Sequence, residues 1–319
     1  MKVLANDGIA TSGVIALKEA GFEVDLKTVP QENLKDYINE NKISVLLVRS
    51  ATKVRQDIID NCPYLKIIGR GGVGMDNIDV EYAREKGLKV INTPAASSHS
   101  VAELVFAHLL GMARFLPESN RQMPLEGDSK FKDLKKSFAK GVELEGKTIG
   151  IIGFGRIGQA TAKMALGLGM RVVAYDPFLE TVNLELSFFD HQSIFFQINT
   201  ISKEDVLKEA DFISLHVPAQ KHYIIDTPEF NLMKDGVFIV NAARGGVINE
   251  VALVNALESG KVSNAALDVY ENEPKPEIQL LMHDKLSLTP HIGAATGEAQ
   301  ERIGTELASQ IISIFEEIA

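Results

Sequence analysis

Three side chains with complementary chemistry each stand just beyond a short apolar run that is typical of a β-strand. They are Arg244 after the run 237–241, Glu273 after the run 265–269, and His291 after the run 286–289. A guanidinium group can bind a carboxylate through two parallel hydrogen bonds. An imidazole exchanges a proton near neutral pH, and a neighbouring carboxylate orients the ring and favours its charged form. Taken alone, Arg244 is better explained as a surface ion-pair partner, Glu273 as a solvated loop acid and His291 as a satisfied polar residue. The three together, each after an apolar strand, favour a reaction centre.

A glycine-rich loop provides the strongest local motif, Thr-Ile-Gly-Ile-Ile-Gly-Phe-Gly-Arg-Ile-Gly over residues 148–158. Its glycines Gly153, Gly155 and Gly158 follow an apolar strand and open an amphipathic segment, which is the pattern of a loop that holds a dinucleotide pyrophosphate at a helix N-terminus. Asp176 ends the next apolar run, where an acid accepts hydrogen bonds from a ribose and repels a 2′-phosphate. The motif therefore predicts NAD rather than NADP as the cofactor. A glycine-rich turn that binds no ligand is the alternative.

These two observations combine into one candidate reaction. Ligands of open parallel sheets bind beyond the carboxyl ends of the strands, so the three side chains are expected near the nicotinamide ring. Hydride transfer at a 2-hydroxy acid needs such a set: Arg244 would bind the substrate carboxylate, and His291 would take the hydroxyl proton while Glu273 holds the imidazole. Asp268, at the end of its strand, is placed to meet the nicotinamide amide.

The elements that must position these residues form two series of apolar runs separated by helical patterns. Such alternation predicts βαβ units and two open, mostly parallel sheets. The first series has strand candidates at 2–5, 22–26, 45–48, 66–69 and 89–92, and the second at 148–152, 171–175, 212–217, 237–241, 265–269 and 286–289.

Four further segments connect or extend the two series. Residues 97–116 are predicted to form a connecting helix, with a capping box at Ser100 and Glu103, and residues 297–318 an amphipathic C-terminal helix. Residues 117–140 are polar and lysine-rich and are predicted as a loop. The phenylalanine-rich segment 187–199 fits the alternation poorly, so we expect an insertion that packs on its own domain, with a partner surface as the alternative.

Length and charge limit the possible classes of protein. The 319 residues, of which 45% are hydrophobic and 24% charged, predict about two globular domains. The 33 Lys and Arg residues against 43 Asp and Glu residues give a net charge of −10, which is opposite to that of a general nucleic-acid binder. An anionic ligand would therefore need a local cationic pocket.

The remaining composition predicts a cytoplasmic protein without a disulfide. The single cysteine, Cys62, is expected to be a buried thiol. The N-terminal apolar run breaks at Asn6 and Asp7, unlike a signal peptide, and no stretch approaches the roughly 18 apolar residues of a membrane span. We expect neither a metal site nor a membrane partner.

The motifs together resemble the D-isomer-specific 2-hydroxyacid dehydrogenase family over nearly the whole chain. The matching pieces are the glycine loop, Val-Arg-Ser-Ala-Thr-Lys-Val at 48–54, Gly-Arg-Gly-Gly-Val-Gly-Met-Asp-Asn at 69–77, Asn-Ala-Ala-Arg-Gly-Gly at 241–246, Ala-Leu-Asp-Val-Tyr-Glu-Asn-Glu-Pro at 266–274 and Thr-Pro-His-Ile-Gly-Ala at 289–294. The resemblance implies a Rossmann NAD-binding domain, residues 97–290, inserted into a flavodoxin-like substrate domain of residues 1–96 and 291–319.

The resemblance also implies a role for individual residues. The implied catalytic residues are Arg244, Glu273 and His291. The implied cofactor-binding residues are Gly153, Gly155, Arg156, Ile157, Gly158, Asp176, His216, Val217, Pro218, Ala242 and Asp268. The implied substrate-binding residues are Arg49, Ser50, Lys53, Arg70, Val73 and Gly74, with Arg49, Lys53 and Arg70 as candidates for a substrate phosphate and the backbone near Val73 and Gly74 for the carboxylate. This chain has Ala219 and Gln220 where the family has Leu-Thr, which removes a hydroxyl contact near the pyrophosphate.

Within the family, the stretch at 48–54 favours the phosphoglycerate dehydrogenase branch, which oxidises D-3-phosphoglycerate to 3-phosphooxypyruvate with NAD, the first step toward serine. A glyoxylate/hydroxypyruvate or D-lactate-type reductase is the alternative within the class, and an NAD-sensing, corepressor-like interaction protein is the alternative outside it. The resemblance also implies a homodimer formed through residues 97–140. Because the sequence stops directly after its last helical segment, a serine-sensing regulatory domain is expected to be absent.

Overall fold

The chain divides into two compact units in the computed structural model, which describes residues 1–318. Unit 1 comprises Met1–Ser100 and the chain from Ala294 onward, and unit 2 comprises Val101–Gly293. Unit 2 is therefore inserted into the chain of unit 1. Each unit is built around one parallel sheet, which confirms the predicted α/β class with two doubly wound sheets.

The sheet of unit 1 has the strand order β2-β1-β3-β4-β5, with every pair parallel. This is the flavodoxin-like order. The strands are β1 (Lys2–Ala5), β2 (Glu23–Asp25), β3 (Ile43–Val48), β4 (Ile67–Arg70) and β5 (Lys89–Asn92). The helices are α1 (Thr11–Glu19), α2 (Gln31–Glu40), α3 (Gln56–Asn61), α4 (Val80–Glu85) and α13 (Gly297–Ile318).

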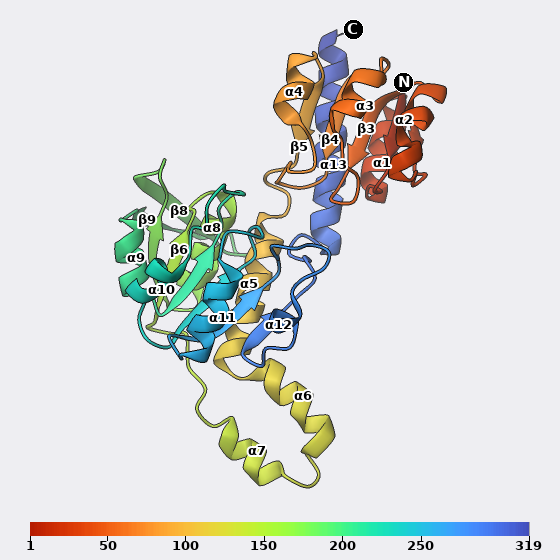
Figure 1. The fold of residues 1–319 in the computed structure, drawn as a ribbon. Coiled ribbons are helices and arrows are strands. Elements are labelled where there is room, and N and C mark those ends of the chain that lie inside the picture. The colour runs from red at the N-terminus through yellow and green to blue at the C-terminus, as the bar shows by residue number, and fades with distance from the viewer. Residues whose placement is uncertain (319) are drawn as a thin grey trace. The chain divides into compact units, whose positions relative to one another are not determined.

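Alternate side chains of each strand enter the cores on opposite faces of this sheet. On β1, Leu4 packs with α2, α3 and α4, whereas Val3 and Ala5 pack with α1 and α13. Figure 1 shows α13, at the blue end of the chain, lying along the unit-1 sheet. The C-terminal helix thus completes one face of a sheet whose strands all come from the first hundred residues.

The sheet of unit 2 has the order β13-β12-β11-β10-β6-β7, again with every pair parallel. Its strands are β6 (Thr148–Ile152), β7 (Arg171–Tyr175), β10 (Phe212–Leu215), β11 (Val237–Asn241), β12 (Val262–Leu267) and β13 (Leu286–Leu288). On the outer side of β7, where a further edge strand could pair, Ala174 and Thr200 form an isolated parallel bridge. The chain adds β7 on one side of β6 and then returns to add β10, β11, β12 and β13 on the other side. This reversal of strand order is that of a Rossmann sheet.

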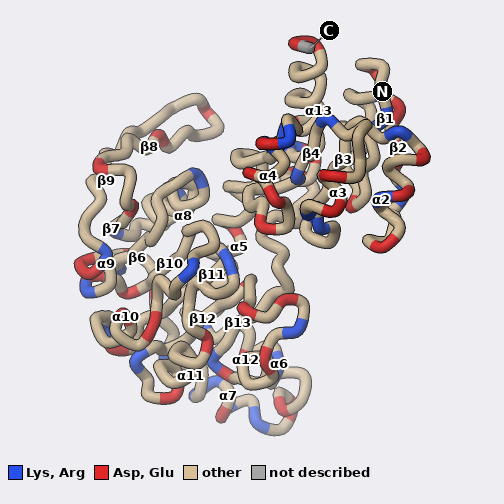
Figure 2. Tube along the Cα trace, turned by 45° about the horizontal axis from the view of Figure 1, so that its top comes forward, with Lys and Arg blue, Asp and Glu red and all other residues tan. Residues whose placement is uncertain are grey.

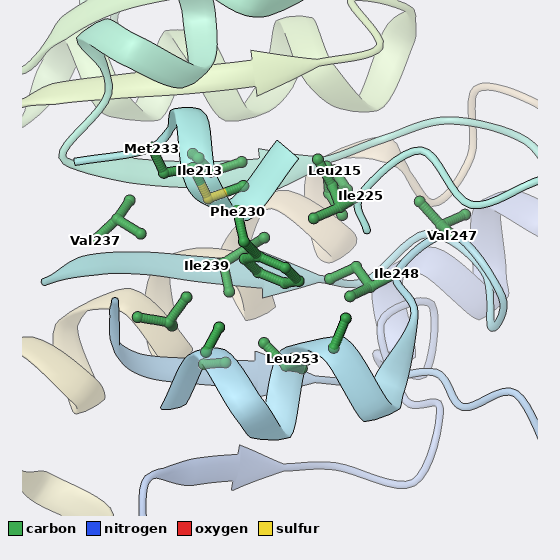
Figure 3. Packing of buried hydrophobic residues seen from close by; sticks show 14 of the residues in the cluster. Ile213, Leu215, Ile225, Phe230, Met233, Val237, Ile239, Val247, Ile248 and Leu253 are labelled. Atoms are coloured by element: carbon green, nitrogen blue, oxygen red, sulfur yellow. The ribbon is translucent and has the colours of Figure 1, made fainter. Parts of the chain in front are cut away.

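Helices cover both faces of this second sheet. One face carries α5 (Ser98–Ala113) and α8 (Arg156–Gly167), and the other carries α9 (Lys203–Glu209), α10 (Thr227–Leu232), α11 (Glu250–Glu258) and α12 (Ile278–Leu281). Figure 3 shows the core on the face covered by α9–α12, in which Ile213 and Ile239 of the sheet pack against Phe230 of α10 and Leu253 of α11. The strands that carry Arg244, Glu273 and His291 beyond their carboxyl ends are therefore packed on both faces of the sheet.

Two predicted segments differ from the structure. Residues 117–140, predicted as a loop, contain the helices α6 (Leu116–Glu126) and α7 (Phe131–Ser137), which extend away from the sheet of unit 2 in Figure 1. The sequence lacks an apolar stripe there because α6 buries no side chain and α7 buries only Leu134. Ser100 lies inside the first turn of α5 rather than at its N-cap, so the predicted capping box is wrong.

The phenylalanine-rich segment is a β-hairpin of β8 (Thr181–Ser187) and β9 (Ser193–Asn199). Leu184 is buried in the core of unit 2, so the hairpin does pack on its own unit. Phe189 and Phe195 remain exposed.

Among the described residues, no single helix has the length and hydropathy to cross a membrane, although α5 and α6 together pass that test as a pair bent by 57°.

The contact between α1 and α13 yields a test of this fold. A Cβ added at Gly13 would lie 2.6 Å from the carbonyl oxygen of Gly304, so Gly13→Ala must push α13 away from α1. We expect a loss of roughly 1–3 kcal/mol in the free energy of unfolding, measured by urea titration with circular dichroism. Gly297→Ala, at the start of α13, is the control, because no atom lies within 4 Å of its added Cβ. Equal stability of the two variants would contradict the close packing.

Candidate active site

The glycine loop between β6 and α8 is shaped to receive a pyrophosphate. Gly153 has a positive φ of 91°, and a Cβ there would collide with the carbonyl oxygen of His216; a Cβ at Gly158 would collide with the carbonyl oxygen of Gly153. Around Gly155, in contrast, a Cβ would meet no atom within 4 Å. The backbone is therefore open to a ligand where α8 begins at Arg156 and Ile157, and no side chain within residues 1–318 caps this end. These residues fit a dinucleotide.

Asp176, directly after β7, is tied to the glycine loop. Its Oδ2 accepts a hydrogen bond from the backbone N–H of Phe154 at 2.8 Å, and its Oδ1 accepts one from Phe178 at 2.9 Å. The carboxylate thus holds the loop in place and keeps lone pairs that a ribose hydroxyl can use. The sequence predicts only the second of these roles.

His216, Val217 and Pro218 follow β10 beside the glycine loop. The N–H of His216 binds the carbonyl oxygen of Ile152, which ends β6. The imidazole is buried, with Nε2 2.9 Å from Ser214 Oγ and 3.1 Å from Thr161 Oγ1. Burial lowers the pKa of His216 to about 3, so this ring stays neutral. Its backbone, rather than its charge, is available to line an adenosine site.

Arg244 lies in a tight loop after β11. Asn241, which ends this strand, accepts from the N–H of Ala243 through its side-chain oxygen and donates to the carbonyl oxygen of Arg244 at 2.9 Å. The loop touches the next one closely, because a Cβ at Gly245 would collide with the carbonyl oxygen of Tyr270. Ala242, half-buried in the same loop, stands at the same strand end.

Glu273 and His291 form a hydrogen-bonded pair. Glu273 Oε2 lies 2.9 Å from His291 Nδ1, and Glu273 Oε1 accepts from the N–H of Tyr270 at 3.1 Å. Partial burial raises the pKa of Glu273, but the hydrogen bond and charge of His291, the Tyr270 N–H and the charge of Arg244 together outweigh it and hold that pKa below its usual value. The carboxylate is therefore ionised at neutral pH, and the three predicted catalytic residues lie together in unit 2.

Asp268 is 1% exposed and accepts three hydrogen bonds from its own chain. Oδ1 accepts from Thr289 Oγ1 at 2.7 Å and from the N–H of Ile292 at 2.8 Å, while Oδ2 accepts from the N–H of Gly293 at 2.9 Å. This carboxylate binds the backbone directly after His291. Its contact with a nicotinamide amide stays a prediction.

In unit 1, the loop after β3 is held by Asp7, a residue that no sequence motif singles out. Asp7 accepts hydrogen bonds from the N–H of Arg49 at 2.6 Å and from both the N–H and the hydroxyl of Thr52. Asn77 donates to the carbonyl oxygens of both loop residues from the other side. Asp7 stands two residues beyond the end of β1, and β1 lies next to β3 in the sheet, so an acidic residue just after β1 is the sequence signal for this contact. The loop that carries Ser50 and Lys53 is thus rigidly defined.

The predicted substrate-binding residues gather at two adjacent strand ends. Val48 pairs with Arg70 across β3 and β4, so Arg49 and Arg70 lie at the same edge. Both side chains approach one glycine segment: Arg49 Cγ lies 3.6 Å from a Cβ added at Gly71, and the Arg70 guanidinium would collide with one added at Gly72.

Val73 and Gly74 continue this glycine segment. Asn92, at the end of β5, donates to the Val73 carbonyl oxygen at 2.7 Å. The backbone there is held from the neighbouring strand, as binding through N–H groups would require.

No cluster of three or more metal-ligating side chains occurs among residues 1–318.

Comparisons with known proteins show which family the chain resembles. The family model "D-isomer specific 2-hydroxyacid dehydrogenase, NAD binding domain" matches residues 106–293. The chain is 45% identical to hydroxypyruvate reductase of Thermotoga maritima over 93% of its length and 92% of that protein. It is 43% identical to D-3-phosphoglycerate dehydrogenase of Methanocaldococcus jannaschii over 99% of its length, but spans only 57% of that relative.

A solved structure has the same fold. D-lactate dehydrogenase from Aquifex aeolicus, complexed with NAD and lactic acid, superposes with a TM-score of 0.74 at 30% identity and covers 99% of this chain and 96% of that one. The fold and the glycine loop define unit 2 as an NAD-binding domain. The chain belongs to the D-isomer specific 2-hydroxyacid dehydrogenase family, and its cofactor is NAD.

The dual contact of Asp176 leads to a test of cofactor choice. Asp176→Asn removes the charge but keeps an oxygen for the Phe154 N–H, so we expect the preference for NAD over NADP to fall about tenfold, equivalent to ~1.4 kcal/mol. Asp176→Ala should also weaken NAD binding, because it frees the loop. Both constants are measured by fluorescence titration, with Asp190→Asn on the exposed hairpin turn as control. An unchanged NAD/NADP ratio in Asp176→Asn would remove this residue from cofactor selection.

Proposed function

We propose that this protein oxidises D-3-phosphoglycerate to 3-phosphooxypyruvate with NAD, the first step toward serine. The observation that supports the reaction class is the Glu273–His291 pair, 2.9 Å apart and within the field of Arg244. Unit 2 serves as the NAD-binding domain, and unit 1 as the substrate domain. The domains predicted for these roles are residues 97–290 and residues 1–96 with 291–319, whereas the units of the structure divide after Ser100 and after Gly293.

Proton transfer falls to His291 in this proposal. Its Nδ1 is engaged by Glu273, so Nε2 is the ring nitrogen that takes the proton of the substrate hydroxyl. The ionised Glu273 stabilises the imidazolium that forms and keeps the ring oriented. Bound NAD supplies the acceptor for the hydride that leaves the same carbon. In the reverse direction His291 returns the proton to the carbonyl oxygen.

Substrate orientation falls to Arg244 and to the backbone N–H groups near Val73 and Gly74. A guanidinium binds a carboxylate in a planar, two-point manner, which fixes the hydroxyl-bearing carbon relative to His291. Asn241, the last residue of β11, holds the backbone of Arg244 through a hydrogen bond. Gly245 lets the loop of Arg244 approach the loop that leads to Glu273. These contacts support the proposal that Arg244 orients the substrate.

The phosphate is assigned to Arg49, Lys53 and Arg70. The first and last of these lie over one glycine segment of unit 1, and Gln31 holds the backbone of Lys53 through two hydrogen bonds of 2.9 Å. Figure 2 shows acidic residues along the chain trace of both units, and the chain has a net charge of −10. The three cations would give an anion a local site on this acidic background.

Reduction of hydroxypyruvate is the second candidate, because the relative at 45% identity carries that name. It needs no phosphate site. The two candidates share every residue of the reaction centre and differ only in the role of the cations of unit 1.

We further propose a homodimer formed through residues 97–140. Helix α6 buries no side chain in its own chain and exposes Leu116, Met123 and Leu125, while Phe131 of α7 is also exposed. A second copy of the chain would remove these apolar side chains from water.

The proton-transfer role predicts a selective loss in one variant. His291→Ala should lower kcat about 10²- to 10⁴-fold, because the substrate hydroxyl loses its base, while NAD still binds with its normal Kd. Turnover is followed by NADH absorbance and cofactor binding by calorimetry. His191→Asn, on the hairpin turn, should behave like the wild type. If His291→Ala abolished NAD binding as well, the histidine would be structural and the mechanism would be wrong.

The phosphate assignment is tested with a matched pair of substrates. Arg49→Ala or Arg70→Ala should raise KM for D-3-phosphoglycerate roughly 10- to 100-fold, the worth of a charged hydrogen bond, and leave KM for D-glycerate unchanged. Arg55→Ala is the control, since Arg55 pairs with Asp79 in the same unit. Equal effects on the two substrates would remove the cations from phosphate binding, and wild-type preference for D-glycerate would favour the hydroxypyruvate reaction.

A further inference from the structure

A histidine outside the reaction centre is buried in unit 2 on the helix α5. His108 is 5% exposed, and both of its ring nitrogens have partners on or just beyond β13. Nδ1 lies 2.8 Å from Ser287 Oγ, and Nε2 lies 3.1 Å from Thr289 Oγ1. The mechanism above does not use this residue, although Thr289 stands only two positions before His291.

The hydrogen bonds of this group have one consistent direction. Thr289 gives its single hydroxyl proton to Asp268 Oδ1, so its oxygen must accept from His108, which places the proton of the neutral imidazole on Nε2. Nδ1 then accepts from the hydroxyl of Ser287. Burial lowers the pKa of His108 more than the charge of Asp268 raises it, which agrees with a neutral ring.

The same chain of hydrogen bonds ends at the backbone beside His291. Asp268 receives the Thr289 hydroxyl and the N–H groups of Ile292 and Gly293. His291 itself has a φ of 57°, a left-handed conformation that a histidine keeps only where its neighbours are held. The contacts on either side of it, at residue 289 and at residues 292–293, converge on one carboxylate.

We propose that His108 is a positioning residue for His291, acting through Thr289 and Asp268 on the turn 289–293. This inference rests on the proposed role of His291 in proton transfer. Any buried imidazole needs polar partners, so the position of these partners carries the argument. Both lie on or just beyond β13, and Thr289 also binds the carboxylate that holds the backbone after His291. The donor at Nε2 keeps the Thr289 hydroxyl directed at Asp268, and this in turn keeps the acid–base imidazole in its strained backbone conformation.

The experiment compares His108→Leu, which removes both hydrogen bonds, with His108→Gln, which restores a donor. In the full chain, His108→Leu should lower kcat about tenfold or more while the Kd of NAD stays normal, because a displaced reacting group loses rate rather than cofactor affinity. Amide hydrogen exchange at Ile292 and Gly293 should speed up about tenfold. His108→Gln should recover most of both changes.

Two controls separate positioning from general stability. Met112→Ala, a cavity-forming change on the same helix, should lower Tm but leave kcat and the exchange of both amides unchanged. Thr289→Val should reproduce His108→Leu, and the double variant should show no further loss, because both act through one path. Thr289→Val also provides the test if His108→Leu does not fold.

The proposal is overturned if His108→Leu lowers Tm but leaves kcat and the exchange of the two amides unchanged, as in the Met112→Ala control. It is also overturned if the losses of kcat in His108→Leu and Thr289→Val add in the double variant. Absence of wild-type turnover with any 2-hydroxy acid would instead refute the proposed function. The exchange rates at Ile292 and Gly293 decide the structural link in that case too, since they require no substrate.

Discussion

The carboxylate of Asp268 is the buried charge on which the geometry of the reaction centre depends. Removing a carboxylate from water is costly unless donors replace the lost hydration. Here a hydroxyl and two backbone N–H groups do so, and all three belong to the turn that carries His291. The backbone N–H of Asp268 also binds the carbonyl oxygen of Asn241, which holds the Arg244 loop with its side chain. One residue at the end of β12 therefore connects three strand ends: its carboxylate binds the turn after β13, and its backbone N–H binds the end of β11.

Close backbone approach is the second constraint, and it acts through glycine. Gly153 and Gly158 let the cofactor loop fold against β10 and onto itself, and Gly245 lets the Arg244 loop touch the loop of Glu273. A side chain at any of these positions would separate groups that must meet within hydrogen-bond distance. The open space at Gly155 shows the opposite use of glycine, where the absent side chain leaves room for a ligand.

Unit 1 uses the same design with different residues. Asp7 holds the loop of Arg49, as Asp268 holds the turn of His291, by accepting backbone N–H groups from a neighbouring strand end. Arg49 and Arg70 then present two guanidinium groups at one strand edge of an otherwise acidic chain. In both units a carboxylate defines the backbone, and the residues proposed to meet the substrate are carried by it.

The sequence alone determined the two parallel sheets, the glycine loop with Asp176, and the residues Arg244, Glu273 and His291, because apolar runs and the residues that end them are local patterns. It could not identify α6 and α7, which bury almost nothing and so lack an apolar stripe. Nor could it show that Asp268, Asp7 and His108 each bind segments far away in the chain. Only the tertiary structure decided that, because a buried polar side chain acquires its role from the donors and acceptors that folding brings to it.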